Sequence, residues 1–289
     1  RQLQRRPLLG GLRRRSSPRR RPRQRGTNMT RCFFVSDLHG RAARYEKLFL
    51  EIEKKAPAAL FIGGDLLPHA MHRSSGGPVS ENFIEDFIGP RLGDLKAKMG
   101  DRYPRIFVIL GNDDPRVEEF ACHVLEREGL WSYIHEKRVE LGEFVVYGYA
   151  YVPPTPFHLK DWERYDVSRY VPHGSVSPED GWRSVAVAPN LIKYATIKED
   201  LDRLAGNSPL DKAVFLFHTP PHETALDRAP LDGKMFEGVP IDLHVGSIAV
   251  RRFIEARQPF VTLHGHIHES TRLTGRWRDK LGRTEMFNA

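Results

Sequence analysis

Cysteines are scarce in this sequence, and long hydrophobic runs are absent. Its 289 residues include only two cysteines, Cys32 and Cys122, and neither has a CxxC partner or a catalytic-cysteine motif around it. A disulfide framework and thiol catalysis are therefore excluded, and both side chains are predicted to be buried thiols. No window approaches the roughly 18 apolar residues of a membrane span, and the apolar run at residues 7–12 is too short for a signal-peptide core. We expect a soluble, cytoplasmic protein without a membrane partner.

Acidic residues are absent from the first 28 positions, which hold 11 arginines and no lysine. The net charge of +8 therefore originates in this segment, and the rest of the chain carries a net charge of −3. Because the segment combines Arg, Pro, Gly and Ser with few apolar residues, burial cannot offset the entropy that is lost on ordering it. We predict a disordered Arg-rich tail over residues 1–28 and one catalytic domain over residues 29–289.

Two interpretations of the tail stay open. It is either upstream sequence read in frame before Met29, or an arm that binds nucleic acid, in which case its deletion would weaken RNA binding. The mildly acidic body gives the second interpretation no support, because nucleic-acid binding depends on basic surfaces.

Short apolar segments, each followed by a polar loop, recur along the chain and are typical of buried strands. They occupy residues 31–36, 59–63, 105–110, 212–217 and 259–263, and the loops after them begin with DLHG, GDLL, GNDDP, HTPPH and HGHIH. A strand pair is expected at residues 138–141 and 144–149, and a last strand-like segment covers residues 282–289.

Helical spacing of apolar residues separates these strands, over residues 42–55, 81–99, 191–204 and 247–256. This alternation favours an α/β fold over a helical bundle or an all-β sandwich. An irregular stretch rich in proline and aromatic residues, residues 151–189, is expected to cover one edge of the site. Four of its aromatic side chains are predicted to pack as a loop lid rather than to stack on a nucleobase: Trp162, Tyr165, Tyr170 and Trp182.

The polar residues that follow five of the strands indicate the chemistry. In α/β folds, ligands collect outside the carboxyl ends of the strands. Each motif alone is weak, but their common position makes chance a poor explanation. Carboxylate, amide and imidazole groups without a thiolate suit two divalent cations such as Mn, Fe or Zn. Two cations about 3.5–4 Å apart can activate water and neutralise a transferring phosphoryl group, which favours phosphate-ester hydrolysis.

The order SDLHG, GGDLL, GND, FH and GHIH resembles that of the calcineurin-like metallophosphoesterases, over roughly residues 29–289. The segments YVPPTPFHLKDWER, FHTPPHETALD, HVGSIAVRRFIEARQP and LHGHIHES are similar to the subgroup described as Icc-related phosphoesterases. The resemblance implies an α/β fold in which a β-sandwich of two packed mixed sheets is flanked by helices. It also implies seven metal ligands: Asp37, His39 and His268 for one cation, Asn112, His218 and His266 for the other, and Asp65 bridging both.

The sequence departs from the family pattern at one position. Most members read GNH followed by Asp or Glu, whereas this chain reads GNDDP, so that Asp113 replaces the imidazole and Asp114 follows it. An ordinary aspartate is ionised at neutral pH and cannot protonate a leaving group, unless burial or a neighbouring carboxylate raises its pKa. Phosphodiesters whose leaving groups need no protonation are then favoured over phosphomonoesters. We predict catalytic roles for Asp113 and Asp114 and substrate contacts from Asn112 and His222, with a turn-stabilising role as the alternative for His222.

The substrate predicted from these features is a small-molecule phosphate ester. Two other classes of protein stay open. One is a catalytically weak metal-binding scaffold of the same fold, against which the intact ligand positions argue. The other is a nuclease or nucleic-acid-binding protein that uses the basic tail, and only the tail supports it.

Overall fold

The computed structural model of the protein describes residues 30–68 and 82–289. The predicted tail, residues 1–28, lies outside the described residues. Within the two described ranges, no helix is both long enough and apolar enough to cross a membrane.

Four strands form the first sheet in the order β1-β2-β3-β4, and all of them run parallel. They are β1 (Cys32–Val35), β2 (Ala59–Gly63), β3 (Arg105–Ile109) and β4 (Ser132–Tyr133). Every residue of β2 is buried, as expected of a central parallel strand that is covered on both faces. The sequence pattern does not predict β4, because two residues are too few to produce a periodic signal.

Six strands form the second sheet in the order β11-β12-β10-β7-β6-β5. They are β5 (Arg138–Leu141), β6 (Phe144–Tyr149), β7 (Ala213–Phe217), β10 (Val261–His264), β11 (Arg278–Leu281) and β12 (Thr284–Asn288). The four central strands run parallel, and the edge strands β5 and β11 run antiparallel to their neighbours. The predicted α/β sandwich is confirmed, with the correction that only the second sheet is mixed.

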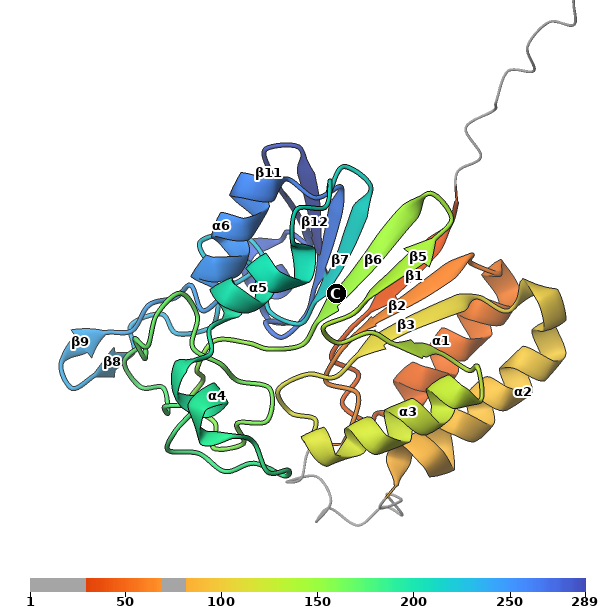
Figure 1. The fold of residues 1–289 in the computed structure, drawn as a ribbon, viewed down its shortest axis with the longest axis horizontal. Helices are drawn as coiled ribbons and strands as arrows, with labels where there is room; N and C mark the ends of the chain where they lie inside the picture. Colours follow the sequence, from red (N-terminus) through yellow and green to blue (C-terminus); the bar gives the residue numbers. More distant parts are fainter. Residues whose placement is uncertain (1–29, 69–81) are drawn as a thin grey trace, which may run out of the picture. The chain divides into compact units, whose positions relative to one another are not determined.

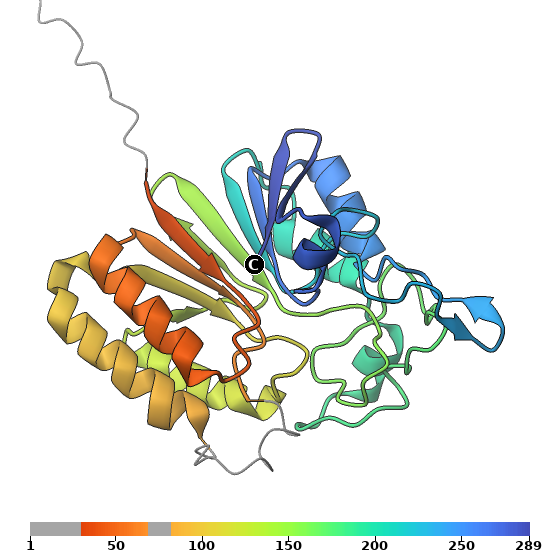
Figure 2. The same cartoon turned by 180° about the vertical axis from the view of Figure 1, so that it is seen from behind.

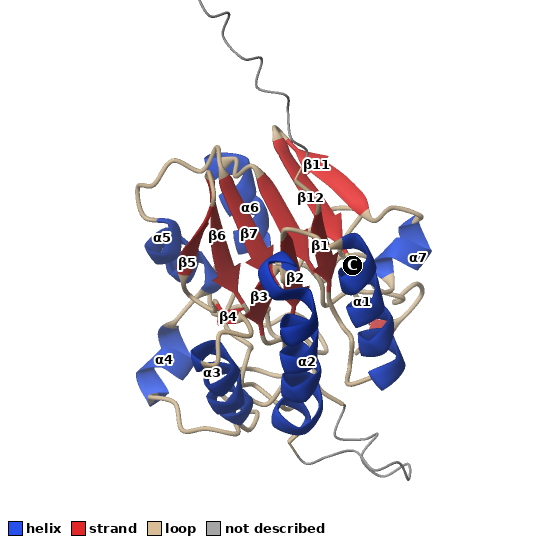
Figure 3. Cartoon of the chain, turned by 90° about the vertical axis from the view of Figure 1, so that its right-hand side faces the viewer, coloured by secondary structure: helices blue, strands red, loops and turns tan. Residues whose placement is uncertain are grey.

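Helices cover the outer faces of both sheets (Figure 1, Figure 2). On the first sheet lie α1 (Ala42–Lys55), α2 (Gly89–Met99) and α3 (Glu119–Arg127), and on the second lie α5 (Ile197–Ala205) and α6 (Ile248–Arg257). In Figure 3, α1 and α2 stand in front of the strands and α6 stands behind them. The shorter helices are η2 (Ile84–Ile88), η3 (Gly100–Arg102), η4 (Arg116–Glu118), α4 (Pro189–Tyr194) and α7 (Ser270–Thr274).

The two sheets pack against each other through their central strands, because β2 contacts β7 and β3 contacts β6. Stacked aromatic pairs extend the core within each sheet: Phe61 and Phe107 in the first, with ring centroids 5.4 Å apart, and Tyr147 and Phe215 in the second, 4.5 Å apart. Outside both sheets, β8 (Met235–Phe236) and β9 (Val239–Pro240) form a small hairpin (Figure 1).

Two predicted helices are interrupted in the structure. The helix predicted over residues 81–99 begins with the π-helical turn η2 before α2, because Pro90 has no N–H for the α-helical bond. The helix predicted over residues 191–204 is divided into α4 and α5. Thr196 separates them, since its extended backbone and its side chain, which accepts from Glu199 N, form the N-cap of α5. Apolar spacing alone does not reveal either break.

The cysteines differ from each other in exposure. Cys122 lies on α3 and is buried, as predicted, whereas Cys32 is exposed, so the prediction of a buried thiol is wrong there. Cys32 begins β1, which is the edge strand of the first sheet in the described part of the chain.

Candidate metal centre

The polar loops after the strands are fastened to one another by main-chain hydrogen bonds. The loop after β1 meets the loop after β2, where Asp37 N donates to Gly64 O over 3.0 Å. The loop after β10 meets the end of β7, where Gly265 N donates to His218 O over 2.9 Å. The motifs predicted from the sequence are therefore adjacent through their backbone.

Four of the seven predicted ligands have a left-handed backbone, although none is a glycine. The φ angles are 54° for Asp37, 48° for His39, 52° for Asp65 and 67° for His266. Such conformations cost roughly 1–3 kcal/mol each and persist where the surrounding structure holds them, most often at functional sites. Four of the nine non-glycine residues with a positive φ in the described part of the chain are therefore predicted ligands.

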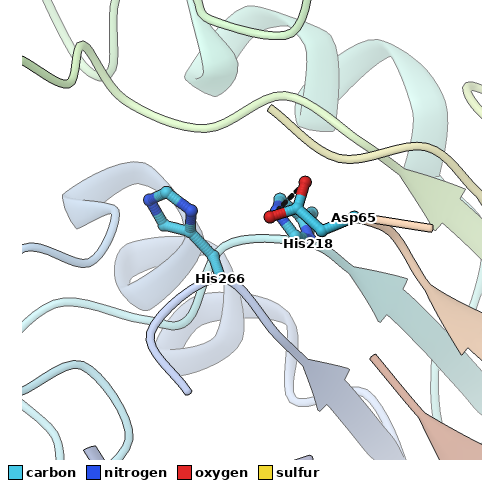
Figure 4. Close-up of side chains that lie close together, drawn as sticks. All are labelled: Asp65, His218 and His266. Atoms are coloured by element: carbon cyan, nitrogen blue, oxygen red, sulfur yellow. Dashed lines mark ion pairs between the residues drawn. The ribbon is translucent and has the colours of Figure 1, made fainter. Parts of the chain in front are cut away.

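Two groups of side chains offer ligand atoms that lie within 4.8 Å of one another: Asp65, His218 and His266 in one, and Asp37, His39 and Asp65 in the other. Figure 4 shows the first group, in which the carboxylate of Asp65 lies against the ring of His218. Asp65 belongs to both groups, which is the place expected of a bridging carboxylate. The structure therefore brings five of the seven predicted ligands together.

The two other predicted ligands lie beside these groups. Asn112 Oδ1 is 3.0 Å from His218 Nε2. The ring of His268 stands edge-on to the ring of His39, with centroids 5.7 Å apart. The His268 side chain is 48% exposed, so it forms the solvent-facing rim of the centre.

The surroundings of His218 favour a positive charge at this centre, from either a proton or a cation. Its Nδ1 lies 2.7 Å from Gly63 O, and because a carbonyl only accepts, Nδ1 carries the proton. Its Nε2 lies 3.0 Å from Asn112 Oδ1 and 3.4 Å from Asp65 Oδ1. A neutral ring would direct its lone pair at two oxygens, which is unfavourable unless a proton or a cation lies between them. Burial lowers the pKa of His266 to about 3, which leaves that ring neutral and able to ligate.

Buried acidic groups dominate the electrostatics of the centre. Burial and the neighbouring Asp65 raise the pKa of Asp113 to about 8, and burial raises the pKa of Asp37 to about 6. Burial would also raise the pKa of Asp65, but His218 and His39 hold it below its ordinary value. Burial lowers the pKa of His218, yet Asp65 and Asp37 outweigh this effect and raise it to about 10. Divalent cations would relieve the repulsion among these carboxylates, so the residues fit the metals that the motifs imply.

Asp113 lies among the ligands, and its side chain is 20% exposed. Its N–H donates to Asp65 Oδ1 (2.9 Å), and its Oδ2 is 3.7 Å from His39 Nδ1. Asn112 Nδ2 donates to its other carboxylate oxygen over 3.1 Å. Asp113 is therefore within reach of a substrate held at the centre, as its predicted catalytic role requires.

The contacts of Asp114 are those of a positioning residue, and the catalytic role predicted for it stays a prediction. Its side chain is fully buried, and both carboxylate oxygens accept main-chain hydrogen bonds: Oδ2 from Leu66 N (3.0 Å) and Gly111 N (2.9 Å), and Oδ1 from Leu67 N (2.9 Å). Burial raises its pKa to about 7. Asp114 thus joins the loops that carry Asp65 and Asn112, which makes it a positioning residue.

His222 lies in neither group of ligand atoms identified within the described ranges. Its ring Nε2 is 3.3 Å from Asp242 Oδ2, and its main-chain N–H donates to Ser247 O over 3.0 Å. These contacts favour the turn-stabilising alternative, and the substrate contact of His222 stays a prediction.

Gly111 is a site position that the motif analysis does not single out. A Cβ atom there would overlap Asp65 Oδ1 and would lie 2.7 Å from His218 Cε1. Only glycine lets the loop after β3 approach the shared carboxylate so closely. In the sequence, Gly111 is recognisable as the first residue of the GNDDP motif.

Residues 151–189 are irregular, as predicted, but their aromatic side chains do not all pack as a lid. Trp162 and Tyr165 are buried, whereas Tyr170 and Trp182 are 65% and 56% exposed. The packing role is therefore confirmed for the first pair and wrong for the second.

A buried carboxylate and imidazole centre at the strand ends of an α/β sandwich is the arrangement of a metal-dependent phosphoesterase. The family model described as calcineurin-like phosphoesterase matches residues 30–270, and the chain belongs to this family. The predicted family resemblance is thereby confirmed, and the family accounts for a dinuclear metal site, while the Icc-related subgroup stays a prediction.

No curated protein matches the chain. Solved structures with the same fold do match it. One crystal structure is 20% identical, covers 90% of both chains and has a TM-score of 0.53. The crystal structure of TT1561 of Thermus thermophilus is 15% identical, covers 90% of this chain and 88% of that chain, and has a TM-score of 0.50. A dimetal phosphatase from Danio rerio, LOC 393393, is more distant, with 11% identity, coverage of 89% and 86%, and a TM-score of 0.47. At these identities, the first two structures show the fold alone.

Proposed function

We propose that the protein hydrolyses small-molecule phosphodiesters in preference to phosphomonoesters, with two divalent cations such as Mn, Fe or Zn at its centre. When bound, such a pair of cations activates water and neutralises charge on the phosphoryl group. The observation that supports the preference is Asp113, a carboxylate that lies against Asp65 and near His39, where most family members have a histidine.

The proposed ligand roles follow the two groups of side chains. Asp65 serves both cations, since it belongs to both groups. The cation on the side of His39 would also be held by Asp37 and His268, and the cation on the side of His218 would also be held by Asn112 and His266.

Asp113 changes the charge that the chain can present to a substrate. An imidazole can carry a positive charge while it donates a proton, but a carboxylic acid is at best neutral. A phosphomonoester dianion would therefore lose a cationic partner here. A phosphodiester carries a single negative charge and depends less on that partner, so its hydrolysis should suffer less from the replacement.

Two other imidazoles come from the same chain segments as the predicted ligands, and both have partners elsewhere. His264 is buried between Thr219 O, 2.9 Å from its Nδ1, and Thr262 Oγ1, 2.7 Å from its Nε2. His222 pairs with Asp242. Neither ring is placed to replace the missing histidine.

The test compares kcat/KM for bis(4-nitrophenyl) phosphate and for 4-nitrophenyl phosphate, using Mn-loaded protein. The native chain should favour the diester. The Asp113→His variant should lower the diester-to-monoester ratio by at least about tenfold, because an imidazolium restores a cationic partner for the monoester dianion and a hydrogen bond to a charged group is worth roughly 1.5–3 kcal/mol. The Asp113→Asn variant is the matched control, since it removes the carboxylate without adding an imidazole, and it should keep the diester preference.

Faster hydrolysis of a monoester than of a diester by the native chain would overturn the proposed preference. If the native chain bound two metals and hydrolysed neither ester, the catalytically weak scaffold would be the better account.

A further inference from the structure

A recess lined by cationic side chains opens between residues 151–189, the short helix α4 and the turn η4. Its cations are Arg116, Lys160, Arg164 and Arg183, and its acids are Asp161 and Glu163. None of the predicted metal ligands lines it. Arg116 and Arg164 have carboxylate partners beyond this lining, Glu119 and Asp200, so any cation without a partner decides what the recess can bind.

Both acids of the recess are already engaged by the chain. Asp161 Oδ2 accepts from Arg116 N (2.8 Å) and from Ser184 Oγ (2.5 Å), and its Oδ1 accepts from Ser184 N (3.0 Å). Glu163 pairs with Lys160, and both of these side chains are buried. Both carboxylates are therefore already occupied by donors of the chain.

Arg183 differs from the other cations of the recess in its partners. Arg116 Nε donates to Glu119 Oε2 (2.8 Å), and Arg164 pairs with Asp200. Arg183 is half-buried and makes no hydrogen bond or ion pair with any residue that the structure describes. Its guanidinium group therefore has donors available for a ligand.

Two buried donors near the recess lack acceptors as well. His135 Nδ1 accepts from Ala150 N (3.1 Å), so its Nε2 carries the proton of the neutral ring. Neither His135 Nε2 nor Trp162 Nε1 has a hydrogen-bond partner within the described part of the chain, although both are buried. The two rings lie 4.8 Å apart, and the Arg116 guanidinium lies over the Trp162 ring at 5.2 Å. These two donors thus have no acceptor at hydrogen-bond distance within the described ranges, although Glu136 Oε2 lies 3.9 Å from His135 Nε2.

We propose that the recess binds an oxyanion, which is the phosphate or carboxylate group of a ligand, with Arg183 as its main cationic partner. An oxyanion accepts two parallel hydrogen bonds from one guanidinium group and so provides the acceptors that Arg183 lacks. The apolar side chains of Val187, Leu191 and Ile192 line the same recess and can contact the less polar part of the ligand.

Two sources could supply this oxyanion. One is a second anionic group on the phosphodiester substrate, and this inference rests on the proposed function. The other is a separate small anion. The first source is favoured because Arg116 links the recess to the candidate metal centre. Arg116 follows the loop of Asn112 and Asp113 in the sequence, and its main-chain N–H donates to Asp161 of the recess.

The first measurement is the binding of inorganic phosphate to the metal-loaded protein, by isothermal titration calorimetry. The native chain should show a recess site in addition to the metal centre. The Arg183→Gln variant should bind phosphate at the recess at least about tenfold more weakly, as expected when a charge-assisted hydrogen-bond donor is removed. Arg183→Lys should retain part of the affinity because it keeps the charge. Arg252→Gln, at an exposed arginine of α6, is the matched control and should bind as the native chain does. Thermal unfolding verifies that each variant is folded.

The second measurement uses two 4-nitrophenyl phosphodiesters, whose second alcohol ends in either a phosphate group or a hydroxyl group. If the substrate supplies the oxyanion, the ratio of kcat/KM between the phosphate-ended and the hydroxyl-ended ester should fall about tenfold in Arg183→Gln, and not in Arg252→Gln. If a separate anion binds, added phosphate should change hydrolysis of both esters alike, and the part of this change that exceeds competition at the metal centre should be absent in Arg183→Gln.

Either of these patterns supports the oxyanion site. Equal phosphate binding by the native chain and Arg183→Gln would overturn it, whatever the hydrolysis rates. Phosphate binding that depends on Arg183, without hydrolysis of any ester, would overturn the proposed function and leave the oxyanion site standing.

Discussion

His218 Nε2 lies 3.4 Å from Asp65 Oδ1, although the two residues follow strands of different sheets. Asp65 comes after β2 and His218 after β7, and these strands contact each other where the sheets pack. The candidate metal centre is therefore assembled by sheet packing. Whatever disturbs that packing should also disturb the centre.

Replacing Asp65 by alanine should remove bound metal and metal-dependent hydrolysis together. Asp65 is the only carboxylate common to both ligand groups found within the described ranges. Mutation of a residue that only orients a metal ligand already lowers metal affinity or activity about 10–100-fold. Removal of the ligand Asp65 should therefore lower them at least about hundredfold. Metal content by mass spectrometry and the rate with bis(4-nitrophenyl) phosphate measure it. Asp94→Ala, at an exposed aspartate of α2, is the control. Two metals retained at the native rate in Asp65→Ala would contradict the bridging role.

Removing metal should destabilise the folded chain. Asp37, Asp65 and Asp113 lie close enough together to perturb one another's ionisation, and cations would offset their repulsion. Each cation that binds only the folded state adds about 2.7 kcal/mol when present at about 100 times its dissociation constant. Denaturant unfolding with and without a chelator measures this difference in free energy. The chelator should have a much smaller effect on Asp65→Ala, and an equal effect on both chains would count against the assignment.

The sequence predicts the centre well because its signal is local. Each predicted ligand lies in the loop that follows an apolar strand, and strand ends converge in α/β folds. The local sequence does not reveal, however, that Asp113 and Asp114 have different contacts. The same dipeptide places Asp113 beside Asp65 and turns Asp114 onto the main chain of Leu66 and Leu67, a contact that depends on how the loops after β2 and β3 meet.

The parts of the fold that the sequence does not predict also depend on contacts between distant segments. Apolar spacing continues across residues 191–204, so the break at Thr196 becomes visible only when its side chain caps α5. Arg183 lies in a segment without periodicity, and its place in the recess results from the bonds between Asp161 and Ser184. No pattern of sequence spacing encodes such bonds.

Asp114→Asn should destabilise the chain even when no metal is bound. Both carboxylate oxygens of Asp114 accept main-chain hydrogen bonds, and an amide replaces one of these oxygens with a donor that would face another donor. Leaving a buried hydrogen-bonding group unsatisfied costs roughly 1–3 kcal/mol. Denaturant unfolding in excess chelator measures the loss without the contribution of metal. Asp101→Asn, at an exposed position of η3, is the matched control. An unchanged unfolding free energy in Asp114→Asn would mean that these bonds do not stabilise the loops.

The buried pair of Glu163 and Lys160 should give stability a measurable pH dependence. Burial raises the pKa of Glu163 to about 7 from an ordinary value of 4.5, although Lys160 opposes the shift, and burial lowers the pKa of Lys160. Between pH 4.5 and about pH 7, the folded chain holds a proton on Glu163 that the unfolded chain has released. The stability due to this proton is therefore fully present below about pH 4.5 and is lost as the pH rises through about 7.

Glu163→Gln cannot release that proton, so it isolates the effect. The unfolding free energy of the native chain, minus that of Glu163→Gln, should decrease as the pH rises through the window between the unfolded and folded pKa values of Glu163. Denaturant titrations at a series of pH values measure this difference. Glu128→Gln, at an exposed position after α3, should leave the pH dependence of the native chain unchanged. A difference that instead grows in favour of the native chain with rising pH would show that Lys160 keeps Glu163 ionised, because an ionised pair stabilises the fold more as the carboxylate loses its proton.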